Sequence, residues 1–350
     1  MKTTLGALLL GVLLTAACTS PPVLPPHSPF PPKSRWEKPL DALLSAPLVT
    51  DGKSFFAALS SGVVMALDPA TGNTLWTRAG ERPGFVVVRP GLLVFIEKGG
   101  VVWGLSSEDG SAQWKTTTTV ADVRSVRLDG NRVFLGGGTG LAGLVASTGE
   151  LKFDLPAADV RDIDAASESI ASIEAGALMV RNREDGAIRF RLASPEGEFG
   201  APALFADGRI VVGSGTRLVR AVSASGKFKW RFKVGARVRD RPLDFLDGKR
   251  VGVLSFEGVF YEVDLGGGDM RRRVLLSSRP FAPPLLVAGR IWAPIFEDEI
   301  AVIDPRTTKL LGRARFGGSF LSPPLLVAGR LVAEVSGPRR LVGLETVPLN

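Results

Sequence analysis

The sequence predicts an all-β protein, an eight-bladed β-propeller of four-stranded blades with seven blades as the alternative, on three observations. An apolar run, a turn rich in Asp, Thr and Gly, and a bulky residue four positions after the glycine recur along the chain. The period is close to 40 residues, the usual length of one propeller blade. The segments between the turns are short, β-rich and punctuated by glycine and proline, unlike the long amphipathic segments of helical repeats.

The repeated motif is clearest in VMALDPATGNTLW at Val64–Trp76 and in VWGLSSEDGSAQW at Val102–Trp114. Successive turn positions lie 37 to 42 residues apart along the chain. They are Gly72, Gly110, Gly149, Gly186, Gly226, Gly268 and Thr308. The last two copies are degenerate, because the motif around them has lost its bulky residue.

The remainder of each repeat predicts two further strands joined by a hairpin. Asp-Gly and Ala-Gly pairs lie between β-rich runs, and such pairs favour tight turns because the turn needs positive φ. The sequence PPLLVAGR occurs twice, at 283–290 and 323–330, offset by 40 residues. Each blade is therefore predicted to contain strands A and B, a connection, strand C, the glycine turn and strand D.

The eighth repeat predicts how the ring closes. It begins at Pro323 and supplies strands A, B and C, after which the sequence stops without a strand D. Trp36, in the segment SRWEKPL, lies 40 residues before Trp76, where a strand D residue belongs. We therefore expect residues 34–350 to form one propeller in which the N-terminal segment pairs with the last blade, leaving no open sheet edge.

The N-terminal segment has the features of an export signal. Residues 1–17 contain a basic start, an apolar run over 5–14 that is too short to span a bilayer, and small residues. Cys18 follows, and the arrangement resembles the lipobox of bacterial lipoproteins, whose cysteine is acylated. Thr15 stands where a lipobox has leucine, so ordinary signal cleavage is the alternative. Residues 18–33 are expected to be a proline-rich tether, and the lack of aspartate after the cysteine implies the periplasmic face of an outer membrane.

Composition excludes several kinds of chemistry. Cys18 and His27 are the single cysteine and the single histidine, so the chain has no internal disulfide, no His/Cys zinc site and no catalytic triad outside the proline-rich segment. The formal net charge is +8. A basic protein can bind anionic lipid, nucleic acid or an acidic partner, although a merely solvated surface is the simpler interpretation. Export disfavours nucleic acid as the partner.

The sequence Ala66–Trp76, with its pattern A-L-D-x-x-T-G-x-x-x-W, resembles the PQQ-like repeat family. The resemblance covers nearly the whole mature chain and implies a propeller in which bulky repeat residues pack between blades. These residues are Trp36, Trp76, Trp114, Phe153, Phe190 and Trp230. One branch of the family contains quinone-dependent dehydrogenases, but Cys18 cannot supply their adjacent-cysteine disulfide and no calcium-binding carboxylate set is recognisable. We therefore expect no cofactor and no metal.

The other branch contains BamB-like lipoproteins of outer-membrane assembly. Export signal, candidate lipidated cysteine, tether, length and blade number are similar here. The resemblance implies a non-catalytic periplasmic scaffold, monomeric within a complex, that binds the POTRA domains of a BamA-like barrel protein and assists insertion of outer-membrane β-barrels. A periplasmic propeller lipoprotein that binds another envelope protein or a ligand is the alternative, and a PQQ-dependent dehydrogenase is the less favoured one.

Charged residues concentrate in the predicted connections between strand D and the next strand A. In a propeller these connections share one face with the loops between strands B and C. The charged segments are 119–127, 158–165 and 235–244. Arginine is favoured at interfaces because its planar group pairs with carboxylates. We expect this rim to bind a partner through Arg161, Asp162, Arg237, Arg239, Asp240 and Arg241; the alternative is that repeated units merely repeat their solvated loops.

Overall fold

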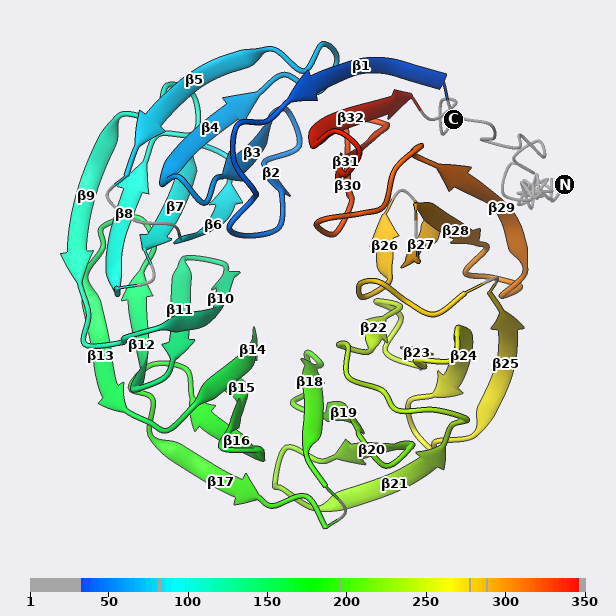
Figure 1. Ribbon diagram of the computed structural model, residues 1–350. Helices are drawn as coiled ribbons and strands as arrows, with labels where there is room; N and C mark the ends of the chain where they lie inside the picture. Colours follow the sequence, from blue (N-terminus) through cyan, green and yellow to red (C-terminus); the bar gives the residue numbers. More distant parts are fainter. Residues whose placement is uncertain are drawn as a thin grey trace, which may run out of the picture.

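The computed structural model describes residues 33–345, apart from 81–83, 98, 196, 277, 288 and 297. All regular structure in this part of the chain is β, arranged as eight sheets in a ring (Figure 1). Without a helix, the described residues offer no helical segment that could cross a bilayer. The predicted signal peptide 1–17, Cys18 and all of the predicted tether except Lys33 lie outside the described residues.

Each of the first seven blades is an antiparallel sheet of four strands that follow one another in the chain. Blade 1 consists of β2 (Val49–Thr50), β3 (Phe55–Ala58), β4 (Val63–Leu67) and β5 (Thr74–Ala79), and blade 2 of β6 (Gly84–Arg89), β7 (Leu92–Glu97), β8 (Val101–Leu105) and β9 (Ala112–Thr117). Blade 3 consists of β10 (Val123–Asp129), β11 (Arg132–Gly137), β12 (Gly140–Val145) and β13 (Leu151–Pro156), and blade 4 of β14 (Val160–Ala166), β15 (Ser169–Glu174), β16 (Ala177–Asn182) and β17 (Ile188–Leu192). Blade 5 consists of β18 (Phe199–Leu204), β19 (Ile210–Ser214), β20 (Leu218–Val222) and β21 (Phe228–Lys233), and blade 6 of β22 (Leu243–Asp244), β23 (Arg250–Leu254), β24 (Val259–Asp264) and β25 (Met270–Leu275). Blade 7 consists of β26 (Leu285–Val287), β27 (Arg290–Ile295), β28 (Glu299–Ile303) and β29 (Leu310–Arg315).

Blade 8 closes the ring as the sequence predicts. It combines β30 (Leu325–Val327), β31 (Arg330–Val335) and β32 (Arg340–Glu345) with β1 (Lys33–Pro39), in the order β1-β32-β31-β30. Trp36 pairs with Gly343 across the closing ladder. The eight-bladed prediction is therefore confirmed, and the seven-bladed alternative is wrong because the N-terminal strand completes a separate sheet.

The strands of a blade differ in burial because they lie at different distances from the ring axis. The first strand of each blade lies innermost and the fourth outermost (Figure 1). In blades 1 and 2 the second strands, β3 and β7, are fully buried, whereas the outer strands β5 and β9 alternate between exposed and half-buried residues. Apolar side chains of neighbouring blades interdigitate, as Phe56 and Val64 of blade 1 do with Leu93 and Phe95 of blade 2. The core is thus a ring of inter-blade contacts, stabilised by removal of apolar surface from water.

The predicted glycine turns lie between strands C and D, and each contacts an aromatic residue of the preceding blade. The six turn glycines have φ between 71° and 82°, a conformation that residues with a Cβ rarely adopt. A Cβ on Gly268 would lie 2.6 Å from Cδ2 of Trp230, so the close approach also requires glycine. The contacting pairs are Trp36 with Gly72, Trp76 with Gly110, Trp114 with Gly149, Phe153 with Gly186, Phe190 with Gly226, and Trp230 with Gly268.

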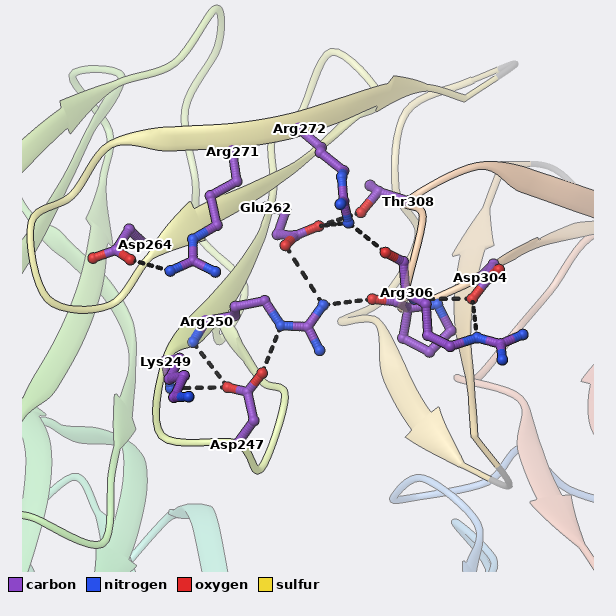
Figure 2. Close-up of polar contacts among 11 residues, drawn as sticks. Asp247, Lys249, Arg250, Glu262, Asp264, Arg271, Arg272, Asp304, Arg306 and Thr308 are labelled. Carbon is purple, nitrogen blue, oxygen red and sulfur yellow. Dashed lines mark hydrogen bonds and ion pairs between the residues drawn. The ribbon is translucent and has the colours of Figure 1, made fainter. Parts of the chain in front are cut away.

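The turn of blade 7 has a different chemistry, shown in Figure 2. Thr308 takes the position of the glycine with φ 56°, and its buried hydroxyl donates to Glu262. Arg272 occupies the aromatic position on β25 and donates to the backbone oxygen of Arg306. The junction between blades 6 and 7 is therefore polar where the six others described above are aromatic.

Candidate partner-binding site

Of the charged segments identified from the sequence, 235–244 lies mostly in a connection, whereas much of 119–127 and most of 158–165 belong to strands β10 and β14. Backbone hydrogen bonds join the connection before strand A to the loop after strand B in blades 3 and 6, between the Gly138 amide and Ala121 O (2.8 Å) and between the Phe256 amide and Arg237 O (3.0 Å). The connections and the B–C loops consequently form a common rim. Within that rim, however, the predicted partner-binding residues have three different environments.

Around blades 3 and 4 the rim arginines are already paired. Arg124 contacts both Asp122 and Asp159, and Arg161 Nη2 lies 2.8 Å from Asp159 Oδ2. The hydrogen bond to Asp122 is the main reason that the pKa of Arg124 lies above its ordinary value. Asp122 and Asp159 both have positive φ, which aspartate tolerates better than most residues. Arg161 thus lies on the expected face, but its guanidinium is engaged in a surface ion-pair chain.

Arg241 has a structural partner inside the protein. Its Nη1 lies 3.2 Å from Asp164 Oδ1, and its Nη2 donates to Ile163 O at 2.7 Å. Asp164 is buried; it also accepts the Leu204 amide (2.8 Å) and lies 3.1 Å from Arg127 Nε. Burial lowers the pKa of Arg241, opposed by the attraction of Asp164, and an arginine nevertheless remains charged. The side chain therefore ties the connection between blades 5 and 6 to blade 4.

Asp162 and Asp240 are two acids whose ionisation the surroundings disfavour. Burial raises the pKa of Asp162, with Arg241 and Arg161 acting in the opposite direction. Burial also raises the pKa of Asp240, and the charge of Asp162 adds to that effect. The two carboxylates therefore lie near enough to influence each other, and both take up a proton at a higher pH than an ordinary aspartate does.

Arg237 and Arg239 differ from these residues because they line a pocket. Val238, between them, is buried; its amide donates to Ser214 O (3.2 Å), and Arg239 O accepts the Ala201 amide (2.8 Å). The connection is thereby fixed against blade 5, while Arg237 O fixes it against blade 6. The pocket measures about 170 Å³, comparable to a cavity that holds a benzene ring. It is lined by Arg237, Arg239, Asp240, Leu254, Phe256, Pro280, Phe281 and Phe296.

The aromatic part of this pocket was missed by the sequence reasoning. Phe256 and Phe296 follow strand B of blades 6 and 7, and each precedes a glutamate, exactly one 40-residue period apart. This recurrence in the sequence could have indicated that the two rings lie at equivalent places in neighbouring blades. No group of three or more His, Cys, Asp or Glu side chains in the described part of the chain is arranged to hold a metal ion.

Comparisons with known proteins identify a family to which the sequence is similar. The profile of the family described as "Outer membrane protein assembly factor BamB" matches residues 32–183 and 162–281, which span the closing strand β1 and blades 1 to 6. A curated protein of that name from Xanthomonas campestris pv. campestris is 29% identical over 147 residues. The match covers 41% of this chain and only 35% of the relative's length.

Solved structures resemble the whole ring at low sequence identity. BamB from Moraxella catarrhalis has a TM-score of 0.68 at 15% identity, over 89% of this chain and 97% of that one. The computationally designed protein Ika8 has a TM-score of 0.75 at 14% identity, over 88% and 100%. Sqt1 from Saccharomyces cerevisiae has a TM-score of 0.72 at 10% identity, over 91% and 99%. At such identities the likeness concerns the fold alone.

Proposed function

We propose, from the premise that this chain belongs to the family of the outer membrane protein assembly factor BamB, that it is a non-catalytic scaffold in the assembly of outer-membrane β-barrel proteins. Its partner would be a BamA-like barrel protein with periplasmic POTRA domains. The chain would act as one subunit of a complex, anchored at the periplasmic face of the outer membrane by a lipid on Cys18. Residues 18–33 would form the tether and residues 34–350 the propeller.

One observation carries the binding role. Arg237 and Arg239 lie on a connection whose backbone is hydrogen-bonded to blades on both sides, and both line the pocket on the rim. A side chain presented from a fixed backbone loses less conformational freedom on binding than one on a mobile loop, which favours affinity. Arginines at the rim of a rigid ring are therefore suited to a partner that carries carboxylates.

The test is affinity capture of the tagged full-length chain, solubilised from its own membranes, followed by mass spectrometry. Arg239→Glu should reduce recovery of a POTRA-containing barrel protein at least about tenfold, because reversal replaces attraction by repulsion at the interface. Arg241 is unsuitable for this test, since its loss would disturb the contact with Asp164 inside the protein. Arg231→Glu, on the exposed outer strand β21, is the matched control and should leave capture unchanged.

Two outcomes would contradict the proposal. Equal capture by wild type and Arg239→Glu would show that this part of the rim does not bind the partner. If the wild type recovers no POTRA-containing protein and another envelope protein is reproducibly present, the chain has a different partner from the one proposed. The propeller fold would not be called into question.

A further inference from the structure

The pocket beside Arg237 has an aromatic floor that extends over three blades. Phe281 and Phe296 meet edge to face with ring centroids 5.4 Å apart, and Phe281 lies 5.6 Å from Phe320. Phe320 in turn meets Phe316 at 5.2 Å. Phe316 and Phe320 are buried, whereas Phe281 and Phe296 are half-buried and reach the pocket. Packing from below therefore fixes the positions of the rings that a ligand would touch.

Two arginines lie on ring faces above this floor. The Arg237 guanidinium is 4.1 Å from the centroid of Phe256. The Arg279 guanidinium lies 4.7 Å from Phe296 and 5.7 Å from Phe256, so it spans the two rings. Stacking of this kind holds the planar group by one face and leaves its N–H edge free to donate hydrogen bonds.

In the part of the chain that the structure describes, the arginines at this pocket lack the ion pairs found elsewhere on the rim. Arg237, Arg239 and Arg279 form no ion pair with a carboxylate of the described residues, and the buried Nε of Arg237 has no acceptor there. The neighbouring Glu257 is already engaged, since it accepts from the Tyr261 hydroxyl at 2.9 Å and from the Ser255 hydroxyl at 3.2 Å. Arg124 and Arg241 on the same rim, by contrast, are paired.

The pocket is thus apolar at its floor and positive at its edge. Among the described residues that line it, Asp240 is the single acidic one. Arg237 and Arg239 line the pocket with that aspartate, and Arg279 lies beside it over two of the rings, so positive side chains outnumber the acidic one. An unpaired buried donor costs free energy, so the buried Nε of Arg237 favours a carboxylate at the edge, and the exposed Arg239 adds charge attraction.

From this complementarity we propose that the pocket binds a segment of a partner protein in which one aromatic side chain is flanked by carboxylates. The ring would enter between Phe256, Phe281 and Phe296, and the carboxylates would pair with Arg237, Arg239 and Arg279. This inference specifies the chemistry of recognition and rests on the proposed binding function only for the identity of the protein that carries the segment.

The test uses the purified full-length chain and fluorescently labelled, end-blocked peptides. The probe is Gly-Asp-Phe-Asp-Gly, and its matched controls are Gly-Asp-Ala-Asp-Gly and Gly-Asn-Phe-Asn-Gly. Fluorescence anisotropy should show at least about tenfold weaker binding for each control, because each lacks either the ring or the charge-assisted hydrogen bonds. Raised salt should weaken binding of the aspartate probe and leave the asparagine control nearly unaffected.

Variants of the chain test the assigned residues. Arg237→Gln combined with Arg279→Gln should bind the probe at least about tenfold more weakly than wild type. Arg239→Gln, at an exposed side chain, should also weaken binding and serves if the double variant folds poorly. Arg124→Gln, on the same face but ion-paired, is the control that should bind as wild type does.

The inference is overturned if the asparagine peptide binds as tightly as the aspartate peptide, if wild type binds neither, or if the arginine variants bind as wild type does. Because the assay needs no partner protein, it is independent of membrane capture. Capture of a POTRA-containing protein without peptide binding would overturn the pocket assignment and support the proposed function. Peptide binding without such capture would support the pocket assignment and contradict the proposed function.

Discussion

Between blades 5 and 6, Trp230 lies on Gly268 and donates its indole N–H to Leu265 O at 3.0 Å. Between blades 6 and 7, the same two positions are held by Arg272 and Thr308. Both junctions fix the C–D turn of one blade against the outer strand of the preceding one. They do so with opposite chemistry, one through a buried ring and the other through charged and polar groups (Figure 2).

The difference extends to the residue that pairs across the strands. Ala221 is opposite Trp230 on β20, and its small side chain leaves room for the indole. Glu262 is opposite Arg272 on β24, and its carboxylate is almost fully buried. Oε1 of Glu262 lies 3.5 Å from Arg250, and Oε2 lies 3.5 Å from Arg272.

Arg250 makes a contact that both junctions share. Its Nη1 donates to Pro305 O at 2.6 Å. Pro305 lies three residues before Thr308, as Leu265 lies three before Gly268, and Leu265 O accepts both the Trp230 indole and Arg209 Nη1 (3.1 Å). The arginine contact is thus common to the two junctions, which differ in the indole of one and the Glu262, Arg272 and Thr308 side chains of the other.

Energetically the two junctions should respond differently to substitution. A buried tryptophan contributes chiefly through apolar surface removed from water, and its loss leaves a cavity. A buried carboxylate contributes little beyond its own desolvation cost, yet removal of one partner leaves the remaining charges uncompensated. The polar junction is therefore expected to be fragile to single changes and tolerant of complete replacement.

The largest effect is expected at the tryptophan junction. Trp230→Ala should lower the free energy of unfolding by about 3–5 kcal/mol, because it removes the ring over Gly268 and leaves a cavity, while Leu265 O keeps only its hydrogen bond from Arg209. Urea denaturation of the purified chain measures this value. Trp230→Phe keeps most of the apolar contact and should cost clearly less. A cost below about 1 kcal/mol for the alanine variant would show that the ring does not hold the junction.

A smaller loss is expected at the polar junction. Glu262→Ala should lower the free energy of unfolding by about 2–3 kcal/mol, since Arg250 and Arg272 lose their shared carboxylate but keep partial contact with water. Glu262→Gln retains the shape and an acceptor for Thr308 and is the matched control. If alanine and glutamine cost the same, the charge of Glu262 does not matter and the comparison between the junctions fails.

Sequence periodicity was sufficient to predict the ring because each blade repeats its own local signals. Glycine turns spaced by 37 to 42 residues fixed the blade boundaries, and Trp36 identified the strand that closes the ring. The polar junction was not predictable in this way. Arg272 and Thr308 departed from the motif and were interpreted as degeneracy, whereas they are compensated by Glu262 on a neighbouring strand.

The candidate site shows the same division between local and long-range information. The rim face followed from blade topology, but Arg161 and Asp162, predicted in a connection, lie on strand β14. Sequence could not separate Arg241 from Arg239, because the partner of Arg241 is Asp164, 77 residues away. Nor did a search for charge alone find Phe256 and Arg279, which meet in the pocket from different blades.

Replacing Glu262, Arg272 and Thr308 together should raise the free energy of unfolding, whereas replacing Glu262 alone lowers it. Glu262→Ala, Arg272→Trp and Thr308→Gly together recreate the small, aromatic and glycine positions of the junction between blades 5 and 6. The free energy of unfolding should rise by about 1–2 kcal/mol, since a buried ion pair gives way to apolar packing and a positive φ returns to glycine. Its dependence on salt should also decrease. A triple variant no more stable than Glu262→Ala alone would show that the two junctions are not interchangeable.

The smallest effect is expected from the turn residue alone. Thr308→Gly removes the cost of a threonine at φ 56°, about 1 kcal/mol, and simultaneously removes the hydroxyl that donates to Glu262, which contributes about as much. The two effects should cancel to within about 0.5 kcal/mol in urea denaturation. Gly268→Thr is the reciprocal control, and it should destabilise strongly because the added side chain meets Trp230 and finds no carboxylate at Ala221. Equal effects of the two exchanges would mean that turn conformation, and not the partner across the junction, decides which residue each turn can hold.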